Sequence, residues 1–194
     1  EFAARHSDAD RPFCCVVSTI EPHDPYCPPK RFFDMYEPDL MEMSPSFRDE
    51  CIGKPEVVRR MRKVYSGMTD SEWRFMATAY YAMISYLDAE VGRLIDGITS
   101  LGISDDTIIL FTSDHGDMLG AHGLITKGIG TGYEEVYNIP LLMCGPGVEP
   151  SGDIGHMVSL VDVAPTVLDL CGVDPIEDVQ GKTMRGILEG TEDE

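Results

Sequence analysis

The sequence predicts an α/β fold with a mainly parallel sheet sandwiched by helices. Two observations predict it: short apolar runs rich in β-branched residues, and helical patterns placed between and after them, in the order strand, helix, strand, strand, helix. The apolar runs cover residues 12–20, 107–112 and 139–144. Continuous apolar runs of this length are typical of strands that are buried on both faces, as in parallel sheets. Such strands combined with helices indicate an α/β domain.

The first run, PFCCVVSTI at residues 12–20, is bounded by charged residues and leads into a proline-rich stretch. We expect a buried strand here that continues into a rigid loop. Residues 22–55 contain seven prolines. So many fixed φ angles exclude long regular elements and predict an irregular wall.

The clearest helix begins at Thr69, where Thr69 and Glu72 have the spacing of a capping box. Apolar residues then recur at steps of three or four up to a stop near Gly102, which predicts a long amphipathic helix; they are Trp73, Met76, Tyr80, Met83, Leu87, Val91, Leu94 and Ile98. A shorter helix is expected from about Asp162 to Leu170, where Pro165 is tolerated in the first turn.

The charge balance argues against two classes of partner. The 194 residues include 34 Asp and Glu against 15 Lys and Arg, for a formal charge of −19. Binding to nucleic acid or to an anionic membrane surface requires clustered basic residues, so neither partner is expected. No apolar run of about 18 residues is present, which argues against a membrane-spanning helix. Six cysteines without a C-x-x-C pair predict free thiols and favour a reducing, cytoplasmic compartment.

The candidate chemistry follows the ends of the predicted strands, where ligands of such sheets collect. Asp114 and His115 come directly after the run at 107–112, and Gly116 frees the chain to turn. An acid and an imidazole at a strand end can bind a divalent cation, although a capping Asp beside a solvated His has the same pattern. Lys127 could contact an anion or lie on the surface. His23, held between two prolines, could donate a proton or belong to a structural turn.

Several segments in order resemble one family, the sulfatases of the alkaline phosphatase superfamily. The resemblance rests on TIILFTSDHGDMLGAHGLITKG followed by YEEVYNIPLLMCGPGV, and on the upstream RPFCCVVSTIEPHDPYCPPKRF with its P-H-x-P-Y loop. Further matches are YYAMISYLDAEVGRLID, SLVDVAPTVLDLCGV and QGKTMRGILEG. The likeness runs from about Arg11 to Gly190 and implies an alkaline-phosphatase-like fold.

The resemblance implies a role for each candidate. Asp114 and His115 fall on two metal ligands of the family, Lys127 on the lysine that contacts the sulfate group, and His23 on the histidine that contacts sulfate and the departing oxygen. The implied reaction is hydrolysis of a small aryl, alkyl or sugar sulfate. The implied ion is calcium, and a histidine at position 115, where many relatives have asparagine, leaves manganese open.

The position of the nucleophile does not follow directly from the resemblance. Family sulfatases use a formylglycine made from the residue that opens a C-x-P-x-R motif, and residues 27–31 match that motif by letter. Cys27 lies in the P-H-x-P-Y region, downstream of the nucleophile's usual place, and no strand that ends in paired acids precedes it. We therefore interpret the match as a coincidence and expect the formylglycine outside this chain.

The chain is accordingly expected to be one partial catalytic domain, residues 1–194, incomplete at both ends and inactive by itself. Two other functions stay open. A phosphodiesterase or phosphonate monoester hydrolase of the same superfamily would use the same cation and lysine. A non-catalytic binding protein would keep the fold without the nucleophile.

Overall fold

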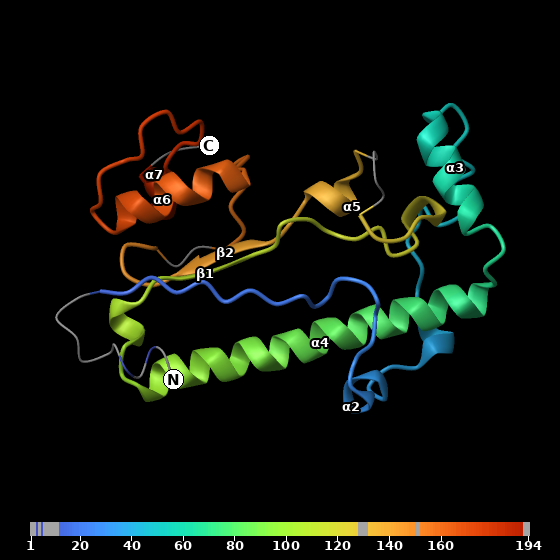
Figure 1. Cartoon of the computed structure of the whole chain (residues 1–194), viewed down its shortest axis with the longest axis horizontal. Coiled ribbons are helices and arrows are strands. Elements are labelled where there is room, and N and C mark those ends of the chain that lie inside the picture. The colour runs from blue at the N-terminus through green and yellow to red at the C-terminus, as the bar shows by residue number, and fades with distance from the viewer. Residues whose placement is uncertain (1–2, 4, 6–11, 128–131, 150–151, 192–194) are drawn as a thin grey trace. The chain divides into compact units, whose positions relative to one another are not determined.

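The computed structural model describes residues 3, 5, 12–127, 132–149 and 152–191 (Figure 1). The chain divides into two compact units. Unit 1 comprises Glu1–Leu101 and His115–Ile139, and unit 2 comprises Gly102–Asp114 and Pro140–Glu194. Among the described residues, no helix is both long enough and apolar enough to cross a bilayer.

Unit 1 contains the long helix α4, Asp70–Ser100, which confirms the predicted helix (Figure 1). Its capping box is formed in both directions. The Glu72 backbone N–H donates to Thr69 Oγ1 at 3.3 Å, and the Thr69 N–H donates to Glu72 Oε2 at 2.7 Å. The helix ends at the predicted place because Gly102 adopts a φ of +69°, a left-handed conformation that glycine takes at little cost.

The proline-rich stretch of unit 1 contains only single turns, as expected. They are α2 (Lys30–Phe33) and the 3-10 turn η1 (Pro38–Leu40), and both pack against α4. Tyr36 and Ser85 join the stretch to α4 through a hydroxyl–hydroxyl hydrogen bond of 2.6 Å. The remaining elements are α3 (Glu56–Val64), the 3-10 turn η3 (Ala121–Gly123) and α5 (Glu134–Tyr137).

The core of unit 1 surrounds the loop that precedes η3. Its buried side chains come from the irregular wall, α3, the segment from this loop through η3, and α5; they are Cys51, Val58, Met118, Ala121, Leu124 and Val136. Asp49 ties the wall to η3: its Oδ2 lies 2.7 Å from His122 Nδ1, while its Oδ1 accepts from the Cys51 backbone N–H within the wall at 2.9 Å. The loop that contains the candidate site residues is therefore anchored in the core.

The predicted buried strand at residues 12–20 is wrong. These residues form no strand, and their side chains are mostly exposed: 86% for Val16 and 79% for Ile20. A β-branched run becomes a strand only where a neighbour provides a hydrogen-bonding ladder. The described sheet consists of β1 and β2 alone, and neither is hydrogen-bonded to this segment.

Unit 2 contains the other two predicted strands, β1 (Ile109–Thr112) and β2 (Leu141–Cys144). They pair antiparallel, with Ile109 opposite Cys144, so the predicted parallel arrangement is wrong for this pair. Alternate residues of β2 are exposed, so β2 is not covered on both faces either. An apolar run indicates a strand but does not encode the direction of its partner.

The helical part of unit 2 confirms the predicted helix near residues 162–170. The turn η4 (Leu160–Asp162) leads into α6 (Val163–Leu170), and α7 (Arg185–Leu188) follows. The buried Thr166 hydroxyl donates to the Asp162 carbonyl at 2.6 Å and accepts from the Met184 N–H at 2.9 Å. This hydroxyl therefore links α6 to the segment before α7. One further turn, η2 (Ser104–Asp106), precedes β1.

Candidate functional site

The loop after β1 is held by a close approach of two backbones. The Gly116 N–H donates to the Val136 carbonyl at 2.8 Å. A Cβ at position 116 would lie 2.1 Å from the Glu135 carbonyl oxygen, so only glycine fits here. The contact fixes the backbone of the residue directly before it, His115.

Half-buried His115 is oriented by its own loop. Its Nδ1 lies 2.8 Å from the Gly116 carbonyl oxygen. A carbonyl oxygen only accepts hydrogen bonds, so Nδ1 carries the hydrogen and the ring lone pair is on Nε2. Asp114, the preceding residue, is exposed and lies at the end of the first segment of unit 2.

His23 and Lys127 are in direct contact although 104 positions separate them in the sequence. Lys127 Nζ lies 2.8 Å from His23 Nε2. His23 Nδ1 lies 2.8 Å from the Asp24 carbonyl oxygen and therefore carries the hydrogen of the neutral ring. The lone pair on Nε2 consequently accepts a hydrogen bond from the Lys127 ammonium group.

Three of the four predicted site residues thus meet within unit 1. The rings of His23 and His115 are 6.0 Å apart between centroids and inclined by 67°. Together with Lys127 they form a group with one ammonium charge and two imidazole rings. Such a group can donate hydrogen bonds to an anion and can hold or transfer a proton.

The sequence reasoning assigned no role to the Tyr26–Asp117 pair. The Tyr26 hydroxyl donates to Asp117 Oδ2 at 2.6 Å, and Asp117 Oδ1 accepts from the Leu119 N–H at 2.9 Å. Burial, followed by the hydrogen bond to Asp117, raises the pKa of Tyr26, and burial raises the pKa of the neighbouring Tyr80 to about 12. Tyr26 therefore stays protonated and ties the loop of His23 to the loop of His115. Tyr26 lies in the P-H-x-P-Y loop and Asp117 in the motif segment that follows the run at 107–112. Their positions inside these two motifs were the sequence signal that could have identified them.

Comparison with known proteins identifies the family. A family model described as Sulfatase matches residues 1–173. The chain belongs to the sulfatase family, within the alkaline phosphatase superfamily. It is 39% identical to the choline-sulfatase of Rhizobium meliloti (strain 1021) over 178 residues, which make up 89% of this chain and 34% of that protein.

Other relatives support the same family. The arylsulfatase of Clostridium perfringens (strain 13 / Type A) is 30% identical over 192 residues, 95% of this chain and 39% of that protein. The chain therefore spans little more than a third of the length of these curated relatives. The structure resembles the phosphonate monoester hydrolase of Agrobacterium radiobacter with a TM-score of 0.85 and 27% identity over 100% of this chain and 41% of that one. For the phosphonate monoester hydrolase of Silicibacter pomeroyi the TM-score is 0.78, with 28% identity, 89% of this chain and 36% of that one.

In this sulfatase-family chain, the metal-ligand role of Asp114 and His115 stays a prediction. Among the described residues, no group of three or more His, Cys, Asp or Glu side chains could hold a metal ion. His115 has the tautomer of a typical metal ligand, with Nδ1–H bonded to a backbone carbonyl and the lone pair on Nε2. Asp114 and His115 therefore suit a cation that has further ligands from elsewhere.

Cys27 is exposed, as are four more of the six cysteines, all of which are free. The chain that follows Cys27 forms a single helical turn, α2, capped at Pro29. The interpretation of its C-x-P-x-R match as a coincidence stays a prediction.

Proposed function

We propose that the whole protein hydrolyses small sulfate monoesters and that His23 and Lys127 contact the sulfate group. The observation that carries this proposal is the 2.8 Å contact between Lys127 Nζ and His23 Nε2 beside the His115 ring. A sulfate oxygen that enters between Lys127 and His23 would replace their mutual hydrogen bond. Family membership supports sulfate as the anion.

Each residue has a distinct task in this proposal. Lys127 donates hydrogen bonds to the oxygens around sulfur and stabilises the negative charge that develops there. His23, once protonated on Nε2, donates that proton to the ester oxygen as the bond between this oxygen and sulfur breaks, so the alcohol leaves neutral. The hydrogen bond between Tyr26 and Asp117 holds the loop of His23 beside the loop of His115.

We further propose that Asp114 and Nε2 of His115 hold part of a divalent cation site, with calcium as the ion and manganese as the alternative. The cation would supply Lewis-acid polarisation of the sulfate group. The nucleophile would be a formylglycine at a position other than Cys27. Detection of formylglycine at Cys27 by mass spectrometry of the active protein would contradict this assignment.

The substrate would be an aryl, alkyl or sugar sulfate. The choline-sulfatase relative supports an alkyl sulfate, and the arylsulfatase relative supports an aryl sulfate. Measuring kcat/KM of the whole protein on choline sulfate and on 4-nitrophenyl sulfate tests the proposal. Absence of turnover on every sulfate ester class, by protein that has its metal and formylglycine, would refute it.

The roles of the two residues are tested by matched variants. Lys127→Ala and His23→Ala should each lower kcat by about 10²- to 10³-fold. Lys30→Ala, which removes an exposed lysine paired with Asp34, is the control and should leave kcat unchanged. Equal kcat for Lys127→Ala and Lys30→Ala would exclude Lys127 from the site.

A second function, hydrolysis of phosphonate monoesters, is favoured by one observation. Two of the similar solved structures are phosphonate monoester hydrolases, with TM-scores of 0.85 and 0.78. A phosphoryl centre needs the same lysine and cation as a sulfuryl centre. Assaying phenyl phosphonate esters beside sulfate esters separates the two, because the proposal requires the higher kcat/KM on sulfate.

A further inference from the structure

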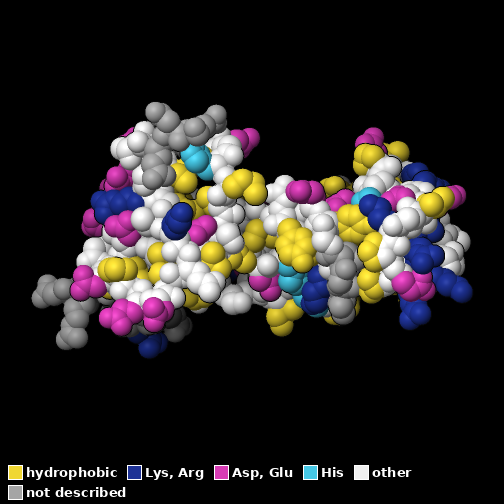
Figure 2. Space-filling view, turned by 90° about the horizontal axis from the view of Figure 1, so that it is seen from above, with side chains coloured by type: hydrophobic (Ala, Val, Ile, Leu, Met, Phe, Trp, Pro, Cys, Tyr) yellow, Lys and Arg dark blue, Asp and Glu magenta, His cyan; other side chains and the backbone are white. Residues whose placement is uncertain are grey.

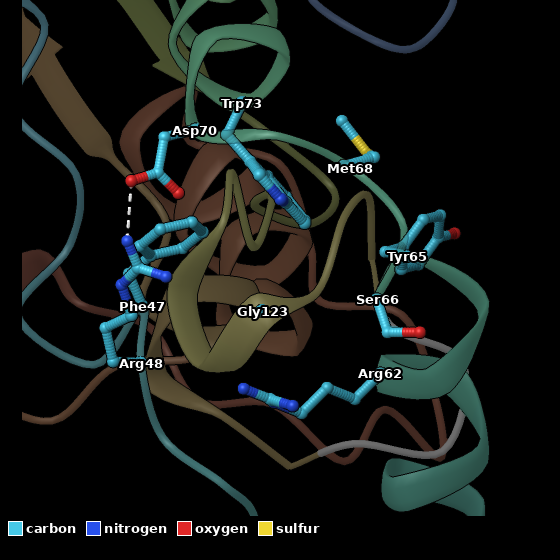
Figure 3. A pocket seen from close by; sticks show the side chains of 9 residues that line it. All are labelled: Phe47, Arg48, Arg62, Tyr65, Ser66, Met68, Asp70, Trp73 and Gly123. Atoms are coloured by element: carbon cyan, nitrogen blue, oxygen red, sulfur yellow. Dashed lines mark hydrogen bonds and ion pairs between the residues drawn. The ribbon is translucent and has the colours of Figure 1, made fainter.

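A pocket in unit 1 lies between α3, the start of α4 and the turn η3, away from the candidate site residues of this unit, and we call it the α3–α4 pocket (Figure 3). Its volume is about 130 Å³, close to the cavity of about 150 Å³ that accommodates benzene in another protein. The lining residues come from four segments of the chain; they are Phe47, Arg48, Arg62, Tyr65, Ser66, Met68, Asp70, Trp73 and Gly123. None of the proposed sulfate or metal contacts is among them.

One wall of the α3–α4 pocket is aromatic. Trp73, only 4% exposed, projects from α4, and its ring stands edge-on to two others. The centroid distances are 5.3 Å to Phe47 and 6.2 Å to Tyr65, both with an interplanar angle of 73°. Such a wall favours a flat apolar group over a fully hydrated ion.

The two arginines of the pocket differ in their partners. Arg48 donates to Asp70 Oδ2 at 2.6 Å, and its guanidinium lies over the Phe47 ring, 5.0 Å from the centroid (Figure 3). Its charge is therefore neutralised within the pocket. Arg62 forms no ion pair among the described residues, and its buried Nε lacks a hydrogen-bond partner there.

The fold makes room for this arginine. Gly123, with a φ of +65°, has no side chain, and a Cβ at that position would lie 3.2 Å from Arg62 Nε. Arg62 crosses this gap and extends from α3 towards the side of the pocket where Arg48 lies (Figure 3). A buried Nε–H without an acceptor is costly, and the guanidinium charge, which has no ion-pair partner among the described residues, would be compensated by an anionic ligand.

The surroundings add positive charge locally to a chain whose formal charge is −19. Lys and Arg side chains gather around α3 (Figure 2), because α3 has the sequence EVVRRMRKV. Arg59 and Arg60 are both paired with Glu56. This leaves Arg62 as the uncompensated cation among the described residues that line the pocket.

We propose that the α3–α4 pocket binds a small monoanion in which a carboxylate is attached to a flat apolar ring. Arg62 contacts the carboxylate, and the ring lies against the wall of Trp73, Phe47 and Tyr65. One uncompensated charge suits a monoanion, and the planar guanidinium fork matches the geometry of a carboxylate. This site is independent of the proposed sulfate site and does not rest on its function.

Trp73 is the one tryptophan of the chain, so its fluorescence reports on binding in the α3–α4 pocket. We would titrate the 194-residue protein with benzoate and follow Trp73 fluorescence at constant ionic strength. Benzamide, of similar shape without charge, and inorganic sulfate, charged without a ring, are the ligand controls. The proposal expects a saturable change with benzoate, affinity at least about tenfold weaker for benzamide, and no displacement of benzoate by equimolar sulfate.

Two variants test whether Arg62 contacts the carboxylate of benzoate. Arg62→Gln should weaken benzoate binding by about tenfold to a hundredfold. Lys63→Gln makes the same charge change at the next, exposed position and should stay within about twofold of the unchanged protein.

Three results would overturn the proposal: equal binding of benzamide and benzoate, displacement of benzoate by equimolar sulfate, or unchanged benzoate affinity in Arg62→Gln. The ligand comparison in the unchanged protein decides the question even if Arg62→Gln folds poorly.

Discussion

Replacing Gly116 with alanine should destabilise unit 1 and displace His115. The added Cβ would stand 2.1 Å from the Glu135 carbonyl oxygen and 3.4 Å from Val136 Cα. The atom it meets first belongs to the backbone, so no side chain can rotate away. To restore ordinary contact at 3.4 Å, the two backbones must separate by about 1.3 Å, the difference between 3.4 and 2.1 Å.

The magnitude follows from two contributions. Forcing one extra carbon into a packed site costs about 1–3 kcal/mol. Separation of the backbones also lengthens the hydrogen bond from the Gly116 N–H to the Val136 carbonyl, now 2.8 Å, which adds about 1 kcal/mol. We therefore expect the free energy of unfolding to fall by about 2–4 kcal/mol. A shift of about 1 Å at His115 should also lower the turnover of the whole protein by about a hundredfold.

Urea unfolding followed by the fluorescence of Trp73, which lies in the same unit, measures this change. Gly97→Ala is the matched control, because a Cβ added at this exposed position of α4 would have none of the described heavy atoms outside its own helical backbone within 4 Å. In a helix interior this change should stabilise by about 0.5–1 kcal/mol. A loss below about 0.5 kcal/mol in Gly116→Ala, the range of neutral surface changes, would refute the close approach.

Three other changes test separate contacts. Thr69→Ala removes the cap of α4 and should lower the free energy of unfolding by about 1 kcal/mol in the same urea assay. The hydrogen bond from the Cys51 N–H, and then the one with His122, lower the pKa of Asp49. The ionised carboxylate therefore stabilises the fold above its ordinary pKa, and this stabilisation is lost as the pH falls through the lowered pKa. Asp49→Asn should lower the free energy of unfolding by about 1 kcal/mol near neutral pH and flatten the stability profile below about pH 5, where this carboxylate begins to be protonated in the unfolded chain; an unchanged slope there would contradict this. Tyr26→Phe should cost about 1–2 kcal/mol and lower kcat of the whole protein, whereas the exposed Tyr137→Phe should do neither.

Local signals in the sequence predicted α4 and α6, but the nine-residue helix α3 was not predicted. The capping box at Thr69 and Glu72, the apolar period and the stop at Gly102 all act within a few residues of each other, so α4 is encoded by its own segment. The same holds for α6. Strand pairing depends on distant partners. The runs at 107–112 and 139–144 therefore indicated β1 and β2 but not their antiparallel direction, and the run at 12–20 is not part of the described sheet.

The candidate site likewise depends on contacts between residues that are distant in the sequence. His23 and Lys127 are 104 positions apart, and Tyr26 and Asp117 are 91 apart. No local rule brings such residues together, so the sequence marked His23, His115 and Lys127 only as separate candidates, and their shared role came from the family resemblance. That resemblance pointed to residues with an assigned role, and it therefore missed the Tyr26–Asp117 pair. The pocket around Arg62 had no sequence signal, because a buried Nε without an acceptor is visible only in three dimensions.

The distribution of buried residues along α4 has a consequence for how this helix opens. All of its buried residues lie between Trp73 and Met83, although the helix continues to Ser100. Tertiary packing and the cap support the first part, whereas the rest depends more on its own backbone hydrogen bonds, which are marginal without such support. Amide hydrogen exchange should therefore be slow up to about Met83 and become faster towards Ser100. The long helix would then fray from its C-terminal end while its first turns, beside Trp73, remain closed.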